Sequence, residues 1–518
     1  MRNRRRSLAL GLCVAVLAAG PGAGQDAARP LSAIDWLSEQ AATQVALPQP
    51  TPDQAEPGVT ASGNVPDVVV TPLDQPAARR VGLVPPSVTG LPDTLWSGSD
   101  GAALARRLGD LPALNLPALQ QLTYTLLLAE ATPPRGNPAP FDLARIDALM
   151  GFGALDPAQA LMEQAGPTTS PAHFARYFDM ALLSGSEAAA CAALRTDASL
   201  SPGKAHDIFC LARSGDWSTA VLTLGSARVL ELVSEDKAAA MERFLDPDLF
   251  EGEPPLPVPN RPDPLSFRLH QAIGTPIPTR IWPLVYANAD LSDTAGWKAQ
   301  IEAAERLAQK GTVPENRLLG LYTQRQPAAS GGVWDRVAAF QRFDTALNTG
   351  SASAVSKTLP AAWRAAQAAR LEVPFANLFA DRLAEFVLSG AAADLAFRTM
   401  LLSPQYETAL RTFPARALRA PVLSAIASGD VPGDVTAQGV EAAILAGFRD
   451  APPDIDIIER AQAGALGAAL LETINLVHGG GQGDVAQLTT GIATLRALGL
   501  EDVARRTALQ VLLLDRPT

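Results

Sequence analysis

Helical signals run almost without interruption from Ser99 to the end of this 518-residue chain, and this continuity constrains the fold more than any other feature. Apolar residues recur at the three- and four-residue spacing of amphipathic helices, and short breaks containing Gly or Pro separate the segments. The alternating pattern of strands is nearly absent. The sequence therefore predicts an all-α protein built from stacked helical hairpins.

Helix-start signals support this interpretation at two positions. Ser99-Asp100 can cap a helix that begins near Gly101, and Ser170 is followed by Pro171 at the first helical position. Later predicted helices include 333–348, 352–370, 372–388, 437–448, 454–477, 485–498 and 500–514.

The first 24 residues have the organisation of a secretory signal peptide. Arg2 and three further arginines precede an apolar stretch from Leu8 to Ala19, and small residues lead to a cleavage site after Gly24. The apolar stretch is shorter than the roughly 20 residues that span a bilayer, which favours cleavage over a retained anchor. Twin-arginine export and the general route both stay open. We expect a periplasmic protein with no stable membrane insertion after cleavage.

The balance of charges argues against nucleic acid as a partner. The chain carries 42 basic and 53 acidic residues, a formal net charge of −11. Cleavage after Gly24 removes four arginines and no acidic residue, which takes the net charge from −11 to −15. Phosphate backbones and anionic lipid head groups repel such an acidic surface.

Two cysteines, Cys191 and Cys210, remain after export. They lie in predicted helices 186–195 and 204–213, which a turn at 199–203 joins into a hairpin. Because a helix rises about 1.5 Å per residue, an antiparallel hairpin brings the two cysteines to similar heights. In an oxidising compartment this predicts a structural disulfide. Two free buried thiols or a redox-active pair are the alternatives, although redox pairs usually have Cys-x-x-Cys spacing.

Proline divides the chain into regions. We expect the Pro-rich part before the helices to be an extended or partly disordered arm. Within it, 29–40 has the pattern of a short helix, and 66–96 is expected to dock on the body or on another chain. A second Pro-rich segment is either a domain boundary or a long loop within one array. The predicted regions are the signal peptide 1–24, the arm 25–98, the helical regions 99–245 and 265–518, and the connection 246–264.

Two local segments resemble tetratricopeptide-type repeats. One is LARSGDWSTAVLTL at 211–224, with Gly215 at the turn and Trp217 entering the second helix. The other is LRALGLEDVARRTALQVLLL at 495–514, with Gly499 between its helices. The resemblance is partial and degenerate, and it covers two hairpins. It implies an α-solenoid that holds other proteins or peptides.

No motif indicates a catalytic, cofactor or metal site. The four histidines lie far apart, and none has the spacing of zinc ligands on one helix. The run Gly479–Gly481 follows a predicted helix rather than a strand, so we interpret it as a flexible loop and not as a phosphate-binding loop. No Gly-x-Ser-x-Gly nucleophile motif occurs. The histidines are His173, His206, His270 and His478.

The segment 315–342 concentrates the residue types that anchor protein interfaces, namely Trp, Tyr and Arg, around a turn of small residues. An alternative interpretation is a hairpin turn with its tryptophan in the core and its arginines in local ion pairs. The candidate partner-binding residues are Tyr322, Arg325, Trp334, Arg336 and Arg342.

These observations predict a non-enzymatic periplasmic scaffold or adaptor for envelope proteins, with no cofactor. One alternative is an enzyme that acts on an envelope polymer such as peptidoglycan, using carboxylates on the inner face of the array. Another is a small-ligand binder with a pocket between hairpins.

Overall fold

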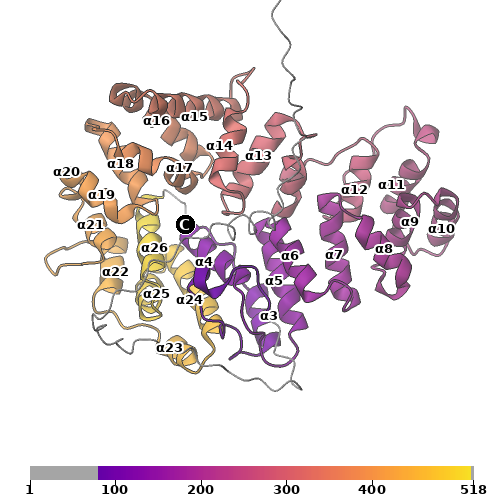
Figure 1. The fold of residues 1–518 in the computed structure, drawn as a ribbon, viewed down its shortest axis with the longest axis horizontal. Helices are drawn as coiled ribbons and strands as arrows, with labels where there is room; N and C mark the ends of the chain where they lie inside the picture. The colour runs from indigo at the N-terminus through magenta and orange to yellow at the C-terminus, as the bar shows by residue number, and fades with distance from the viewer. Residues whose placement is uncertain (1–79, 515–518) are drawn as a thin grey trace, which may run out of the picture. The chain divides into compact units, whose positions relative to one another are not determined.

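A computed structural model describes residues 80–514, so the predicted signal peptide, the predicted helix at 29–40 and most of the arm lie outside the described residues. The described residues all belong to one compact unit of the chain. Within 80–514 the protein is all-α, and extended backbone pairs only in isolated bridges (Figure 1). The predicted fold class is confirmed.

Polar caps start the helices where the sequence predicts them. The Asp100 carboxylate accepts a hydrogen bond from the backbone N–H of Ala103, 2.9 Å away, and α3 begins at Gly101. The Ser170 hydroxyl accepts from the backbone N–H of His173, with Pro171 in the first turn of α7. The first backbone N–H groups of a helix have no helical carbonyl to bind, and each cap satisfies one of them.

The elements of the first half are α2 (Pro86–Thr89), α3 (Gly101–Gly109), α4 (Pro117–Leu128), α5 (Ala139–Phe152), α6 (Leu155–Ala165), α7 (Pro171–Ser184), α8 (Ala188–Thr196), α9 (Lys204–Arg213), α10 (Trp217–Val229), α11 (Glu235–Leu245) and α12 (Pro264–Ala272), with the 3-10 helices η1 (Ala198–Leu200), η2 (Pro247–Phe250), η3 (Thr279–Ile281) and η4 (Leu284–Leu291). The second half contains α13 (Trp297–Ala308), α14 (Glu315–Thr323), α15 (Val333–Asn348), α16 (Ala352–Ala368), α17 (Glu372–Ala384), α18 (Gly390–Leu401), α19 (Tyr406–Thr412), α20 (Pro414–Ala417), α21 (Pro421–Ser428), α22 (Gly439–Phe448), α23 (Ile455–Gln462), α24 (Leu466–Gly481), α25 (Val485–Ala497) and α26 (Glu501–Leu513).

The described part of the arm, residues 80–96, packs on the protein's own helices. Val81 pairs with Ala131 after α4, and the ring of Trp96 is buried with its centroid 4.9 Å from that of Phe141. A Cβ at Gly467 of α24 would lie 2.3 Å from the Trp96 ring, so glycine is the residue that permits this contact. This end of the arm is therefore part of the core.

The last helix packs against one of the first. α26 contacts α4, and the side chain of Gln510 accepts a hydrogen bond from the backbone N–H of Ala118 at 2.8 Å (Figure 1). One hydrophobic core runs from Leu91 to Leu514 and joins both halves of the chain. In a solenoid each repeat contacts only its sequence neighbours. The predicted solenoid arrangement is therefore not confirmed, and the hairpins share a long-range core instead.

A second hydrophobic core joins α7 to α12 and holds residues such as Phe178, Phe209 and Met241. The Pro-rich connection 246–264 leads from α11 to α12, and both helices contribute to this core. α12 also packs on α7, so the segments before and after the connection are held together by contacts between their helices.

Two details of the C-terminal helices differ from expectation. The predicted helix 454–477 is two helices, because Gly464 adopts a left-handed φ of 87° between α23 and α24. The run Gly479–Gly481, expected to be a flexible loop, forms the last turn of α24. A Cβ at Gly480 would lie 2.5 Å from the Leu488 backbone, so the glycines let α25 approach closely.

Candidate functional site

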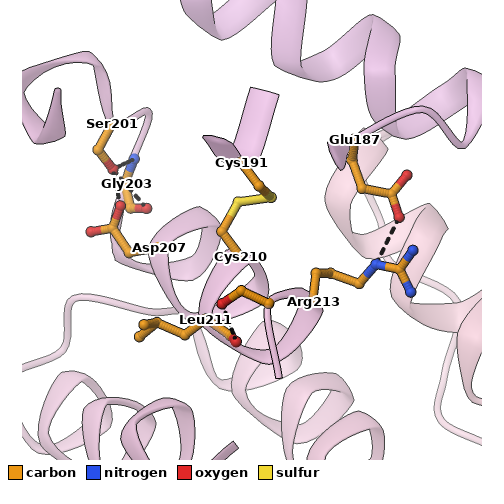
Figure 2. Close-up of a disulfide and its surroundings, with 9 residues drawn as sticks. Glu187, Cys191, Ser201, Gly203, Asp207, Cys210, Leu211 and Arg213 are labelled. Atoms are coloured by element: carbon orange, nitrogen blue, oxygen red, sulfur yellow. Dashed lines mark hydrogen bonds and ion pairs between the residues drawn. A yellow bond between two sulfur atoms is a disulfide. The ribbon is translucent and has the colours of Figure 1, made fainter. Parts of the chain in front are cut away.

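A disulfide braces the hairpin at the centre of the second core. Cys191 of α8 and Cys210 of α9 are bonded, with their Cα atoms 5.2 Å apart (Figure 2). Both cysteines are buried, and α9 also packs against α10. The predicted pairing is confirmed. The bridge fixes the hairpin of α8 and α9, which we call the platform, and α10 lies against it.

Removing the bridge is expected to loosen this platform selectively. Cys191→Ala/Cys210→Ala opens a loop with a sequence separation of 19 residues, for which chain entropy predicts a loss of about 3 kcal/mol. Hydrogen exchange should show faster exchange in α8 to α11 and unchanged exchange in α22 to α25. Equal exchange of both groups of helices in the variant and the wild type would contradict a stabilising role for the bridge.

Helix α10 presents apolar side chains on two opposite faces. Ala220, Leu224 and Ala227 point inward and are buried. Leu222 and Val229 point outward and are 74% and 84% exposed. Large apolar side chains are normally on the enclosed side of a helix, whereas the principal contacts of α10 are with α9 and α11 alone.

The exposed apolar side chains of α10 and the residues just after it are clustered in one short stretch of the chain, which we call the α10 face. Of the fifteen large apolar side chains that are exposed among residues 80–514, six fall in this short stretch, and the others are scattered. Clustered exposed apolar side chains are typical of interaction sites, whereas single exposed apolar residues are not. The residues of the α10 face are Trp217, Val221, Leu222, Val229, Leu230 and Leu232.

Local contacts hold the α10 face in place. The Asp216 carboxylate caps α10 by accepting from the backbone N–H of Thr219. The Trp217 ring lies 5.8 Å from Phe244 of α11, which anchors one edge of the face. The guanidinium of Arg228 pairs with Glu235 and Glu242, which joins α10 to α11. The apolar surface is thus carried by a well-supported helix.

The structure divides the candidate interface residues of 315–342 into two groups. Tyr322 is buried, and its hydroxyl donates to Glu305 Oε1 at 2.7 Å. The Arg336 guanidinium donates to both oxygens of the same carboxylate, at 2.9 and 2.6 Å. Burial, followed by the Glu305 charge, raises the pKa of Tyr322 well above its ordinary value, so the phenol stays a donor. These two residues are engaged inside the protein.

The remaining three candidate residues lie closer to the surface. Trp334 is half-buried, with its ring centroid 5.0 Å from that of Trp297. Arg325 and Arg342 have exposed side chains. A partner contact by these two arginines stays a prediction.

Asp179 is a partly buried acid on α7, a helix that packs against α8. Burial raises the pKa of Asp179 on α7 to about 7. Arg176 and Lys237 oppose this rise, while the charges of Asp263 and Asp147 add to it. Lys237 also pairs with Asp263, which caps α12, at 3.2 Å. The region therefore carries one carboxyl that keeps its proton to near-neutral pH.

The raised pKa predicts a specific pH dependence. Because the folded pKa of Asp179 is about 7 and the unfolded value is 3.8, the folded state binds the extra proton between these values. The stabilising effect of this proton is fully present below the unfolded pKa and is lost as pH rises through 7. Asp179→Asn should therefore gain stability relative to wild type between pH 5 and pH 8, as measured by the difference in melting temperature. A difference that is flat or shrinks over this range would contradict the assignment.

The histidines are distributed over α7, α9, α12 and α24, and the described residues contain no group of His, Cys, Asp and Glu side chains that could hold a metal ion. No helix between residues 80 and 514 has the length and apolar character needed to cross a membrane.

Sequence reasoning missed the α10 face. Its residues read as an ordinary second helix of a hairpin, since Trp217 and Ala220 fit the repeat pattern. No sequence signal separates the exposed Leu222 from the buried Leu224, because both fit the apolar pattern of the helix.

Compared with protein-family models, with curated proteins and with solved structures, the chain shows no match.

Proposed function

We propose that the chain is an exported, non-enzymatic scaffold of the bacterial envelope that binds a partner protein through the α10 face. The observation that carries the proposal is the clustering of exposed apolar side chains on a helix that contacts other helices on its inner side only. The predicted signal peptide at 1–24 supports a periplasmic location, where a disulfide is stable.

The spacing on the α10 face favours an amphipathic helix as the partner element. Val221, Gly225 and Val229 follow one another at four-residue intervals, so they form a row along one side of the helix. No heavy atom outside the helix lies within 4 Å of a Cβ built at Gly225, which leaves a shallow gap in this row. The side chains of a second helix pack into such gaps between ridges. The degenerate tetratricopeptide-type resemblance at 211–224 supports the same kind of partner.

Co-purification of the mature protein under native extraction tests the proposal. Leu222→Glu/Val229→Glu places two charges on the α10 face and should remove the partner protein from the purified material, because a desolvated charge opposes apolar burial. The matched control is Val387→Glu/Leu418→Glu, which changes two exposed apolar residues outside the α10 face. Loss of the partner in both variants, or its retention in both, would count against the α10 face.

A further inference from the structure

A cleft of about 940 Å³ lies where the second core meets η4, α13 and α14. Arginines from three helices line it, namely Arg213 of α9, Arg268 of α12 and Arg317 of α14. The apolar side chains of Leu183 and Phe209 also contribute to the wall. The cleft thus combines guanidinium groups with an apolar surface.

A buried carboxylate holds two of these arginines together. Glu187 is 1% exposed, and its Oε1 atom forms an ion pair with Arg213 Nε, 3.0 Å away (Figure 2). The same Oε1 atom accepts a hydrogen bond from Arg268 Nη2 at 3.5 Å. The Oε2 atom of Glu187 has no hydrogen-bond partner. Both arginines therefore share one oxygen, and neither forms the bidentate pair that would occupy two of its N–H groups.

The sharing leaves donors and positive charge available to a ligand. The closest contact of Arg213 with Glu187 is through Nε, no hydrogen bond within residues 80–514 engages its Nη groups, and about half of its side chain is exposed. Two guanidinium charges face one carboxylate charge at this point. A planar anion that accepts two parallel hydrogen bonds matches a guanidinium edge.

We infer that this cleft binds the carboxylate of a short peptide whose neighbouring side chain is apolar. The carboxylate takes the Nη groups of Arg213, and the apolar side chain lies against Leu183 and Phe209. Asp156 and Asp290 also line the cleft, and Asp290 accepts a hydrogen bond from the Thr279 hydroxyl. Their charges disfavour a second anionic group, so the ligand is a peptide with a single carboxylate.

Calorimetric titration of the mature full-length protein with N-acetyl-alanyl-leucine tests this inference. The free acid should bind saturably and at least tenfold more tightly than its C-terminal amide, because the amide cannot accept two charge-assisted hydrogen bonds. Equal binding of acid and amide, or no saturable binding of the acid, would overturn the inference. Tighter binding of inorganic phosphate than of the peptide acid would overturn the peptide assignment.

Matched arginine variants locate the site. Arg213→Gln should weaken binding of the free acid at least tenfold. Arg195→Gln removes the same charge from an exposed position on α8 that does not line the cleft, and it should change affinity less than twofold. Equal weakening by both variants would show a general effect of net charge and would overturn the assignment to the cleft.

Glu187 acts as a positioning residue, since it holds Arg213 without contacting the ligand. Glu187→Gln keeps the shape of the side chain but loses the ion pair that holds Arg213. Loss of the Glu187 charge alone would favour an anion, so a reduced preference for acid over amide, which we expect, reports the loss of positioning. This ratio is insensitive to general destabilisation of the protein, which would weaken both ligands alike. An unchanged ratio would contradict the positioning role.

Discussion

Arg145→Met is expected to lower the free energy of unfolding by about 3–5 kcal/mol. The guanidinium of Arg145 on α5 is almost fully buried and donates to the carbonyl oxygens of Leu127 at 2.7 Å, Ala129 at 3.1 Å and Val81 at 3.2 Å. Methionine fills much of the space but donates no hydrogen bond. The carbonyl of Leu127 lies in the last turn of α4, where no helical N–H reaches it, so it would stay buried and unsatisfied.

The same residue ties the arm to the body, since Val81 belongs to the arm and Leu127 to α4. Urea denaturation should therefore report the loss in stability, and proteolysis should cleave the variant near residue 81 faster than it cleaves the wild type at the same place. Arg106→Met, at an exposed position on α3, is the matched control and should change stability by less than about 0.5 kcal/mol. An Arg145 variant that is as stable as this control would contradict the structural role.

Arg336→Met is expected to be the second strongly destabilising change, with a loss of about 3 kcal/mol. Its guanidinium supplies two of the three donors to Glu305, which is buried on α13. Without Arg336 this buried carboxylate is left with only the Tyr322 hydroxyl as a donor. Tyr322→Phe removes that single donor and should cost less, about 1–2 kcal/mol.

Arg342→Met is the control for this prediction, because Arg342 lies on the same helix, α15, with an exposed side chain. It should leave the denaturation midpoint nearly unchanged. The comparison also separates the two interpretations of 315–342. Loss of stability without loss of partner binding in the Arg336 variant assigns that residue to the interior, whereas loss of binding in the Arg342 variant would make the exposed arginine part of an interface.

Local physical rules account for what the sequence could predict. Side-chain caps such as Asp100 and Ser170 act within one helical turn, so their spacing is visible in the sequence. The pairing of Cys191 with Cys210 depends only on two adjacent helices and their turn. Both predictions are confirmed because they require no knowledge of distant contacts.

Long-range packing accounts for what the sequence could not predict. The run Gly479–Gly481 reads as a helix breaker, yet close approach of α25 stabilises it as helix and makes the small residues necessary. The hydrogen bond between Ala118 and Gln510 joins segments that are far apart in the sequence, and so does the packing of Trp96 on Gly467. The spacing of apolar residues within each helix gives no information about such pairs. A Gly can end a helix or permit a close helix contact, and the partner segment decides which.

The α10 face shows the same limitation for function. A large apolar residue in an amphipathic pattern is expected to be buried, and Leu222 looks no different in sequence from buried Leu224. Only the positions of α9 and α11 show which side of α10 is covered. The candidate residues of 315–342 illustrate the converse, since Tyr322 and Arg336 have interface-like identities but serve the interior.

Site-specific photo-crosslinking in cells tests the central claim most directly. A photoreactive amino acid at Leu222 in the α10 face is compared with one at Leu418, which is 85% exposed and lies outside that face. The proposed scaffold function predicts a crosslink from position 222 to one envelope protein, reproducibly and through a helical segment of that protein, with no such product from position 418. Absence of a protein crosslink at 222, or the same products from both positions, would contradict binding through the α10 face.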